Sequence, residues 1–187
     1  MTTSRDDASA PGAHTPVAAA SGLVLVEKGL FRLSDPQAGP LRPAPDPTED
    51  TPVTTGSGPD LALFLSALED ADVWAVLELW AGPAPEPEGP WEVRVSHVVE
   101  VTGPDVALVS GVSALGTECV LPVPAGAYTL EARCRGRAAA REAFHTWLAA
   151  EDDDADSEPP TGLEHWHLRL HTAGPGPHPE IGEPPTR

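Results

Sequence analysis

The chain has 187 residues, of which 40% are hydrophobic, enough to build the core of one domain. Its 29 acidic residues against 11 basic ones give a formal net charge of −18. A charge of this sign and size repels nucleic acid phosphates and anionic membranes at long range, so neither is expected as a partner. A basic protein partner is favoured instead.

The amino-terminal residues lack the features of an export signal. Residues 1–20 include Arg5, Asp6 and Asp7 and contain no apolar run of the required length. No other stretch approaches the roughly 18 apolar residues that are needed to span a bilayer. We therefore expect a cytoplasmic protein without a membrane segment.

The 23 prolines and 17 glycines are concentrated in a few stretches. Residues 1–20, 36–59, 83–90 and 174–187 combine proline with polar residues, and burial there cannot offset the entropy of ordering. The expected organisation is a disordered tail over 1–20, one β-sandwich domain over 21–173 and a disordered tail over 174–187. The segments 36–59 and 83–90 are expected to be a proline-rich insertion and a spacer loop.

Short apolar segments between these stretches predict β-strands. Residues 73–80 are branched and aromatic, which is typical of a central strand. In residues 91–101, valines alternate with polar residues from Trp91 onward, which indicates a strand with one buried face. The segment 61–68 fits a strand or a helical face, and we prefer the strand. Further strands are expected at residues 23–26, 30–33 and 163–170.

Two turn signals predict β-hairpins. A Gly-Pro pair at residues 103–104 follows the 91–101 strand, and the next strand begins at Val106. A Pro-Ala-Gly turn at residues 124–126 separates two further alternating segments. We expect each turn to join two paired strands, with one core shared by Trp91, Val95, Leu121, Tyr128 and Leu130.

The two cysteines are expected to be reduced. Cys119 and Cys134 fall on the two strands of the second predicted hairpin, where they would lie diagonal to each other. A disulfide requires a short separation and convergent Cβ vectors. Two partly buried thiols are therefore favoured over a bridge.

One helix is expected at residues 138–150, which lack glycine and proline and place Phe144, Trp147 and Leu148 on one stripe. An acidic run follows, at the negative end of the helix dipole, so the helix should end there. Many short strands with one helix predict a mainly β protein. The expected fold is an antiparallel β-sandwich of about eight short strands with one helix and proline-rich disordered loops and tails.

Four features follow one another along the chain. They are the predicted strand at 73–80, Trp91-Glu92-Val93-Arg94-Val95, Gly103-Pro104-Asp105-Val106, and a Pro-x-Gly-x-Tyr turn within 121–130. In this order the stretch 74–135, about a third of the chain, resembles the competence-associated DNA-entry nuclease inhibitor family and related uncharacterised actinobacterial β-sandwich proteins. The resemblance implies inhibition of a nuclease or toxin by protein binding, with no catalytic residues. The insertion after Leu33 and the segment after Arg135 have no counterpart in it.

Three histidines are the candidate metal ligands. His165, His167 and His171 share one face of the predicted strand, and imidazoles two residues apart can chelate zinc or another transition metal. The same alternation is explained without a metal, because the intervening apolar residues form an inner face and leave the histidines with Arg169 on a solvated outer face. No metal or other cofactor is expected, and a metal-dependent enzyme is the alternative.

The acidic run contains the candidate partner-binding residues. It lacks the central glycine and the distal glutamate of a calcium loop, which leaves a solvated loop or a negative patch that docks on a basic surface. The six candidates are Glu151, Asp152, Asp153, Asp154, Asp156 and Glu158.

No nucleophile motif, phosphate-binding loop or paired Cys-x-x-Cys is present in the sequence. The expected function is that of an acidic non-catalytic binding protein, an inhibitor or immunity protein acting on a basic nuclease or toxin. A structural assembly component is the third interpretation.

Overall fold

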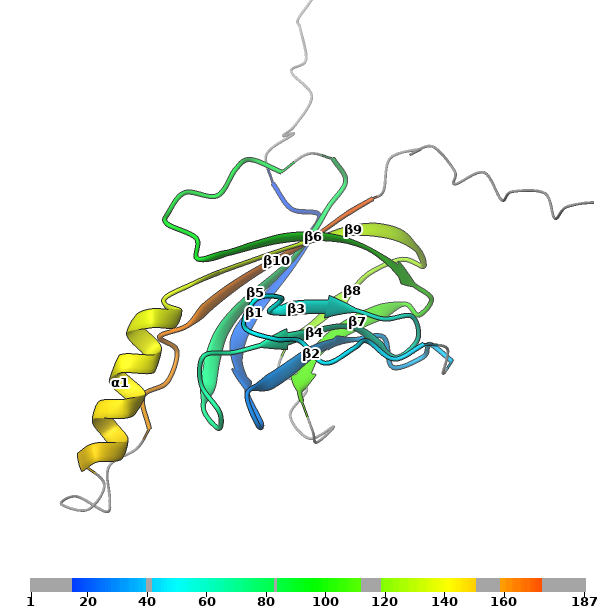
Figure 1. Cartoon of the computed structure of the whole chain (residues 1–187). Helices are drawn as coiled ribbons and strands as arrows, with labels where there is room; N and C mark the ends of the chain where they lie inside the picture. The colour runs from blue at the N-terminus through cyan, green and yellow to red at the C-terminus, as the bar shows by residue number, and fades with distance from the viewer. Residues whose placement is uncertain (1–14, 40–41, 83, 112–118, 151–158, 173–187) are drawn as a thin grey trace, which may run out of the picture.

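The computed structural model describes residues 15–39, 42–82, 84–111, 119–150 and 159–172, which form two five-stranded sheets and one helix, α1 (Arg137–Ala150). Figure 1 shows the sheets as two layers, with α1 at one end. Sheet A has the order β1 (Ala18–Leu25), β5 (Asp72–Trp80), β10 (His165–Thr172), β9 (Gly126–Arg135) and β6 (Val93–Val101). Sheet B has the order β3 (Val53–Thr55), β4 (Asp60–Leu65), β2 (Leu30–Ser34), β7 (Asp105–Ser110) and β8 (Cys119–Pro122).

The core lies between the sheets and is built by alternation along each strand. Three aromatic rings occupy it: Phe31 and Phe64 stack with centroids 4.8 Å apart, and Trp166 meets them edge-on at 5.5 and 5.4 Å. All three side chains are fully buried. Such a cluster joins β2 and β4 of sheet B to β10 of sheet A through apolar burial and ring geometry.

The predicted fold class is confirmed as mainly β with one helix. The segment 73–80 is the inner strand β5, which pairs with both β1 and β10, and 61–68 contains the strand β4. Ten strands are present in the described residues, two more than expected. One pair, β5 with β10, is parallel in an otherwise antiparallel arrangement.

Both predicted hairpins are wrong. The strand after residues 103–104 is β7, which pairs with β2 and β8 in sheet B, whereas β6 belongs to sheet A. The turn at 124–126 likewise connects β8 of sheet B to β9 of sheet A. Both connections cross between the layers, because every strand has an apolar face that either sheet can bury.

One residue of the predicted shared core is misplaced. Leu121, Tyr128 and Leu130 are buried together, and Val95 packs against them. Trp91 instead lies near His167 on the outer face of sheet A, with ring centroids 6.1 Å apart. The prediction for the other four residues is confirmed.

The expected tail and insertion boundaries also change. The strand β1 begins at Ala18, inside the predicted tail, and β3 lies inside the 36–59 segment and pairs with β4. Backbone pairing therefore orders part of a segment that has few large apolar residues. The predicted carboxyl-terminal tail, 174–187, lies outside the described residues.

Candidate binding site beside the helix

The start of α1 is held by Glu92, which precedes β6. Its carboxylate accepts hydrogen bonds from the backbone N–H groups of Gly136, Arg137 and Ala138 at 2.6, 3.0 and 3.2 Å. These N–H groups have no partner inside a helix, and a negative charge at this end is favoured by the helix dipole. A residue 45 positions before Arg137 thus fixes where the helix starts.

Glu164 is fully buried beneath the same end of the helix. Its carboxylate accepts hydrogen bonds of 2.8 Å from the Ser66 hydroxyl, the Ala67 N–H and the indole N–H of Trp166. The guanidinium of Arg137, which is 7% exposed, lies 3.4 Å away and forms an ion pair. A buried carboxylate requires this kind of compensation by charge and hydrogen bonds.

Cys134 borders this network, with its sulfur 3.4 Å from a Glu164 oxygen. Burial raises the pKa of the Cys134 thiol far above its ordinary value, and the negative charge of Glu164 raises it further. A thiol in this state is a poor nucleophile. Cys119 is also buried, and the two cysteines are not joined in a disulfide, as expected.

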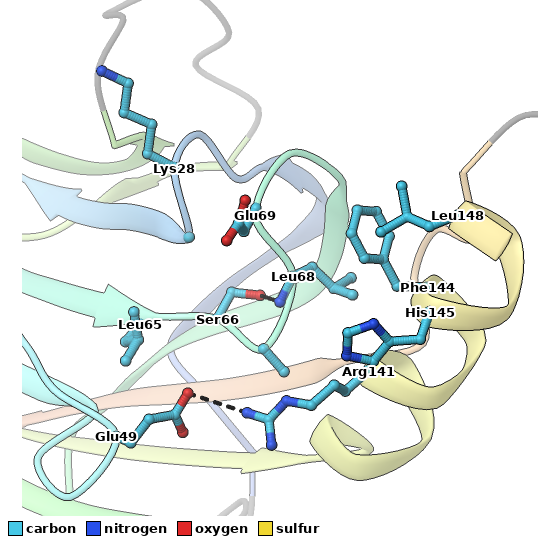
Figure 2. Close-up of a pocket in the computed structure, with 12 residues that line it drawn as sticks. Lys28, Glu49, Leu65, Ser66, Leu68, Glu69, Arg141, Phe144, His145 and Leu148 are labelled. Atoms are coloured by element: carbon cyan, nitrogen blue, oxygen red, sulfur yellow. Dashed lines mark hydrogen bonds and ion pairs between the residues drawn. The ribbon is translucent and has the colours of Figure 1, made fainter. Parts of the chain in front are cut away.

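A pocket of about 380 Å³ opens between α1 and the segment that follows β4. One wall is the helix face of Arg141, Phe144, His145 and Leu148, which recur at helical spacing. Figure 2 shows Phe144 and Leu148 across from Leu68. The remaining lining residues are Lys28, Gly29, Glu49, Leu65, Ser66, Ala67 and Glu69.

The pocket has an apolar floor and a charged rim. Leu68 is 1% exposed, Phe144 is half-buried and Leu148 is 44% exposed. On the rim, Arg141 pairs with Glu49 at 3.1 Å. This arrangement suits an apolar side chain whose neighbours are polar, as in the anchored residues of protein interfaces.

The first turns of α1 pack and the later ones are more open, which is why the pocket exists. Arg137 and Ala140 are buried, whereas the stripe predicted from Phe144, Trp147 and Leu148 is half-buried or exposed. The sequence identified this apolar stripe but not its exposure. The apolar side chains of this stripe are thus only partly buried by the rest of the domain.

The six predicted partner-binding residues, Glu151, Asp152, Asp153, Asp154, Asp156 and Glu158, lie outside the described residues. The structure therefore neither places nor pairs them. The last residue of α1, Ala150, directly precedes Glu151 in the chain.

The outer face of the histidine strand is covered, not solvated as expected. His167 and Arg169 contact the Glu78 carboxylate at 2.9 and 3.2 Å, and Arg169 also donates to the Pro85 carbonyl at 2.6 Å. His171 lies 3.2 Å from the carbonyl of Gly82. The loop between β5 and β6 thus packs on sheet A, because its backbone carbonyls at Gly82 and Pro85 offer partners to His171 and Arg169.

The negative charge of Glu78 compensates the positive charge of Arg169 on the outer face of sheet A. Burial raises its pKa, but hydrogen bonds from His167 and Trp80 and the charges of His167 and Arg169 outweigh burial and lower it. Among the described residues, no three or more His, Cys, Asp or Glu side chains are grouped to hold a metal ion. No helix of the described residues is long and apolar enough to cross a membrane.

Comparison with known proteins gives fold relatives. Neither a family model nor a curated protein matches the sequence significantly. A solved structure of ComJ from Bacillus subtilis, an inhibitor of the DNA degrading activity of NucA, superposes with a TM-score of 0.56 at 13% identity, over 85% of this chain and 99% of ComJ. This chain shares the ComJ fold. The crocagin biosynthetic gene J product is also similar, with a TM-score of 0.50 at 13% identity, over 81% of this chain and 96% of that one.

The ComJ resemblance inferred from residues 74–135 is confirmed at the level of fold, and it extends well beyond that stretch. Sequence reasoning missed the network around Glu164. The one available signal was alternation, which places Glu164 on the same side of the strand as the buried Trp166 and away from the histidines.

Proposed function

We propose that this protein is a non-catalytic inhibitor that binds a basic nuclease or toxin in the cytoplasm. The observation that carries the proposal is the fold shared with ComJ over 85% of this chain and 99% of ComJ. At 13% identity the likeness concerns the fold alone, so the inhibitory role rests on this proposal and on its test.

The state of the reactive side chains supports a non-catalytic role. Glu164 and Arg137 compensate each other inside the fold, and Cys134 is buried with a raised pKa. On β10, His167 contacts the Glu78 carboxylate and His171 contacts the Gly82 carbonyl. Groups that are committed to structural contacts of this kind are not available to a substrate.

We place the docking face at the pocket beside α1 and the acidic run that follows the helix. Six acids in eight residues attract a basic surface over about a Debye length, roughly 8 Å at physiological salt. The half-exposed Phe144 and Leu148 supply an apolar contact next to this charge in the chain. Charge would then set the association rate, and the apolar contact the dissociation rate.

Co-purification of the full chain from its native cells, followed by a nuclease assay of the partner, tests the function. Stoichiometric addition of this protein should abolish the DNA-degrading or toxic activity of the partner. A partner that binds at saturation and keeps its full activity would contradict inhibition.

The docking face has its own test. Neutralising Asp152, Asp153 and Asp154 to Asn should slow association at low salt by at least about tenfold. The control D46N/D50N/E88Q removes three exposed charges elsewhere and should change the rate much less. Equal rates for the two variants would remove the acidic run from the docking face.

A second pair of variants examines the apolar contact. Leu148→Ser should speed dissociation of the partner, and Val120→Ser, a matched residue on β8, should not, since the two side chains are 44% and 47% exposed. Both changes are on the surface, so thermal unfolding should stay close to that of the unchanged protein. Dissociation that is insensitive to Leu148 would exclude the pocket.

A further inference from the structure

The strand β6 is the longest open edge in the described residues. The edge strands β3 and β8 of sheet B have three and four residues, and β1 of sheet A lies against β8. β6 has nine residues and pairs only with β9 there. Two hollows, of about 370 and 210 Å³, are both lined by Arg94 and Val95. Glu49, Asp50 and Pro52 also line the first, beside the start of β6, and Glu131 and Arg133 of β9 also line the second.

The register shows which backbone groups face the open edge. The Trp74 N–H donates to the Glu164 carbonyl, and Trp74 is in register with His165 of the parallel strand β10. The backbone N–H and C=O groups of Glu164 therefore point toward β5, and those of His165 point toward β9. His165 is in register with Arg135, so the backbone groups of Arg135 point toward β10. Those of the preceding residue, Cys134, therefore point toward β6. The bond from Glu92 N–H to Cys134 O agrees.

Cys134 is in register with Val93, so Val93 and every second residue after it face β9. The residues between them direct their N–H and C=O groups away from the sheet. These are Arg94, Ser96, Val98 and Glu100.

The sequence of this edge is self-complementary about His97. In an antiparallel pair of β6 strands centred there, Arg94 lies opposite Glu100 of the second copy, and Ser96 lies opposite Val98. On the inner face, valines meet valines. Opposite charges and apolar pairs at facing positions are the interactions that stabilise antiparallel strands.

We propose that two copies of this chain associate through β6, in antiparallel register about a two-fold axis at His97, and extend sheet A across the dimer. The pairing satisfies the outward backbone groups of four residues in each copy. It also covers Val98, which is 71% exposed, and places Val95, half-buried at the edge, against Val99 of the second copy. The closed two-fold arrangement uses the same surface on both copies.

Charge sets the strength and the salt dependence of this dimer. A net charge of −18 on each copy opposes association, and a single pair of strands is a small interface. We therefore expect a dimer on the order of micromolar to tens of micromolar affinity that strengthens as salt rises from low to physiological levels.

Two charge reversals and their mixture test the register by sedimentation of the full chain. Arg94→Glu places Glu against Glu100, Glu100→Arg places Arg against Arg94, and each variant alone should bind itself at least about tenfold more weakly. Mixed in equal amounts, they restore both opposite-charge pairs and should form a heterodimer. A wild-type chain that stays monomeric at about 100 micromolar, or a mixture that stays monomeric, overturns the proposal.

Cross-linking provides a second readout. His97 faces itself in a non-hydrogen-bonded pair, where Cα atoms lie about 4.5 Å apart, within disulfide range. His97→Cys should therefore form a covalent dimer under mild oxidation, and Ser96→Cys, at the same edge but facing Val98, should cross-link far less. Equal cross-linking of both variants, or none, overturns the register. These tests need no inhibited partner, so their failure would leave the inhibitor proposal intact. Failure of the inhibition assay would likewise leave the dimer proposal intact.

Discussion

Glu164 and Ser66 are joined by a buried hydrogen bond of 2.8 Å across 98 residues of sequence. It ties the start of β10 to the end of β4, and Arg137 adds the first turn of α1 to the same carboxylate. Three parts of the chain that are distant in sequence therefore depend on one side chain, at the base of the pocket beside the helix.

Replacing Glu164 should destabilise the whole domain. Glu164→Ala leaves the charge of Arg137 without its buried counter-ion and deprives Ser66 and Trp166 of their acceptor, and it should cost about 3–5 kcal/mol. Glu164→Gln keeps the shape and one acceptor and should cost less. Urea unfolding measures both values, and a loss below about 1 kcal/mol for the alanine variant would contradict this role.

Gly136 sets the direction of the chain between β9 and α1. Its φ of +82° is one that side chains rarely adopt, and an added Cβ would lie 2.3 Å from the Leu163 carbonyl oxygen. Gly136→Ala should therefore reduce stability by about 2–4 kcal/mol. Gly82→Ala is the control, since a Cβ there has no other atom within 4 Å, and thermal melts of the two variants should differ clearly.

Asp35 gives stability a defined pH dependence. Burial raises its pKa, but hydrogen bonds from the backbone and hydroxyl of Thr102 and from the N–H groups of Gly103 and Gln37 outweigh burial and hold it below 3.8. A lowered folded-state pKa means that the stabilisation is complete above the unfolded-state value and is lost as the pH falls through the folded-state value.

Asp35→Asn should consequently cost about 1–3 kcal/mol near neutral pH. The difference from the unchanged protein should shrink as the pH is lowered below about 4. Chemical denaturation at a series of pH values measures this difference. A gap that stays constant down to about pH 3 would show that the Asp35 charge is not what matters.

The two thiols should be inert in the folded protein. Cys119 is 1% exposed and Cys134 is fully buried, and the pKa of Cys134 is raised. A thiol reagent at neutral pH should label neither until the chain is unfolded, after which it should label both. Rapid labelling of one thiol under native conditions would indicate that its strand opens locally.

The alternation of side chains predicted most strands and the face that each one buries. It is a local property, because successive residues of a strand point to opposite faces. The same rule failed at Trp91. Just after it, the Glu92 N–H donates to the carbonyl of Cys134, which is also in register with Val93, so that two residues of one strand oppose one residue of the other, as in a β-bulge. Such an irregularity reverses the side-chain phase before it, and composition does not reveal it.

The sequence by itself determined the acidic charge, the mainly β class and the single helix. Which strands pair was decided only by the tertiary structure, because both sheets bury apolar faces of the same kind and the chain crosses between them. The tertiary structure alone also decided that His167 contacts Glu78 and that Glu164, Ser66 and Arg137 lie in contact. These contacts join residues far apart in the chain, and their stabilisation depends on burial that exists only once both layers have packed.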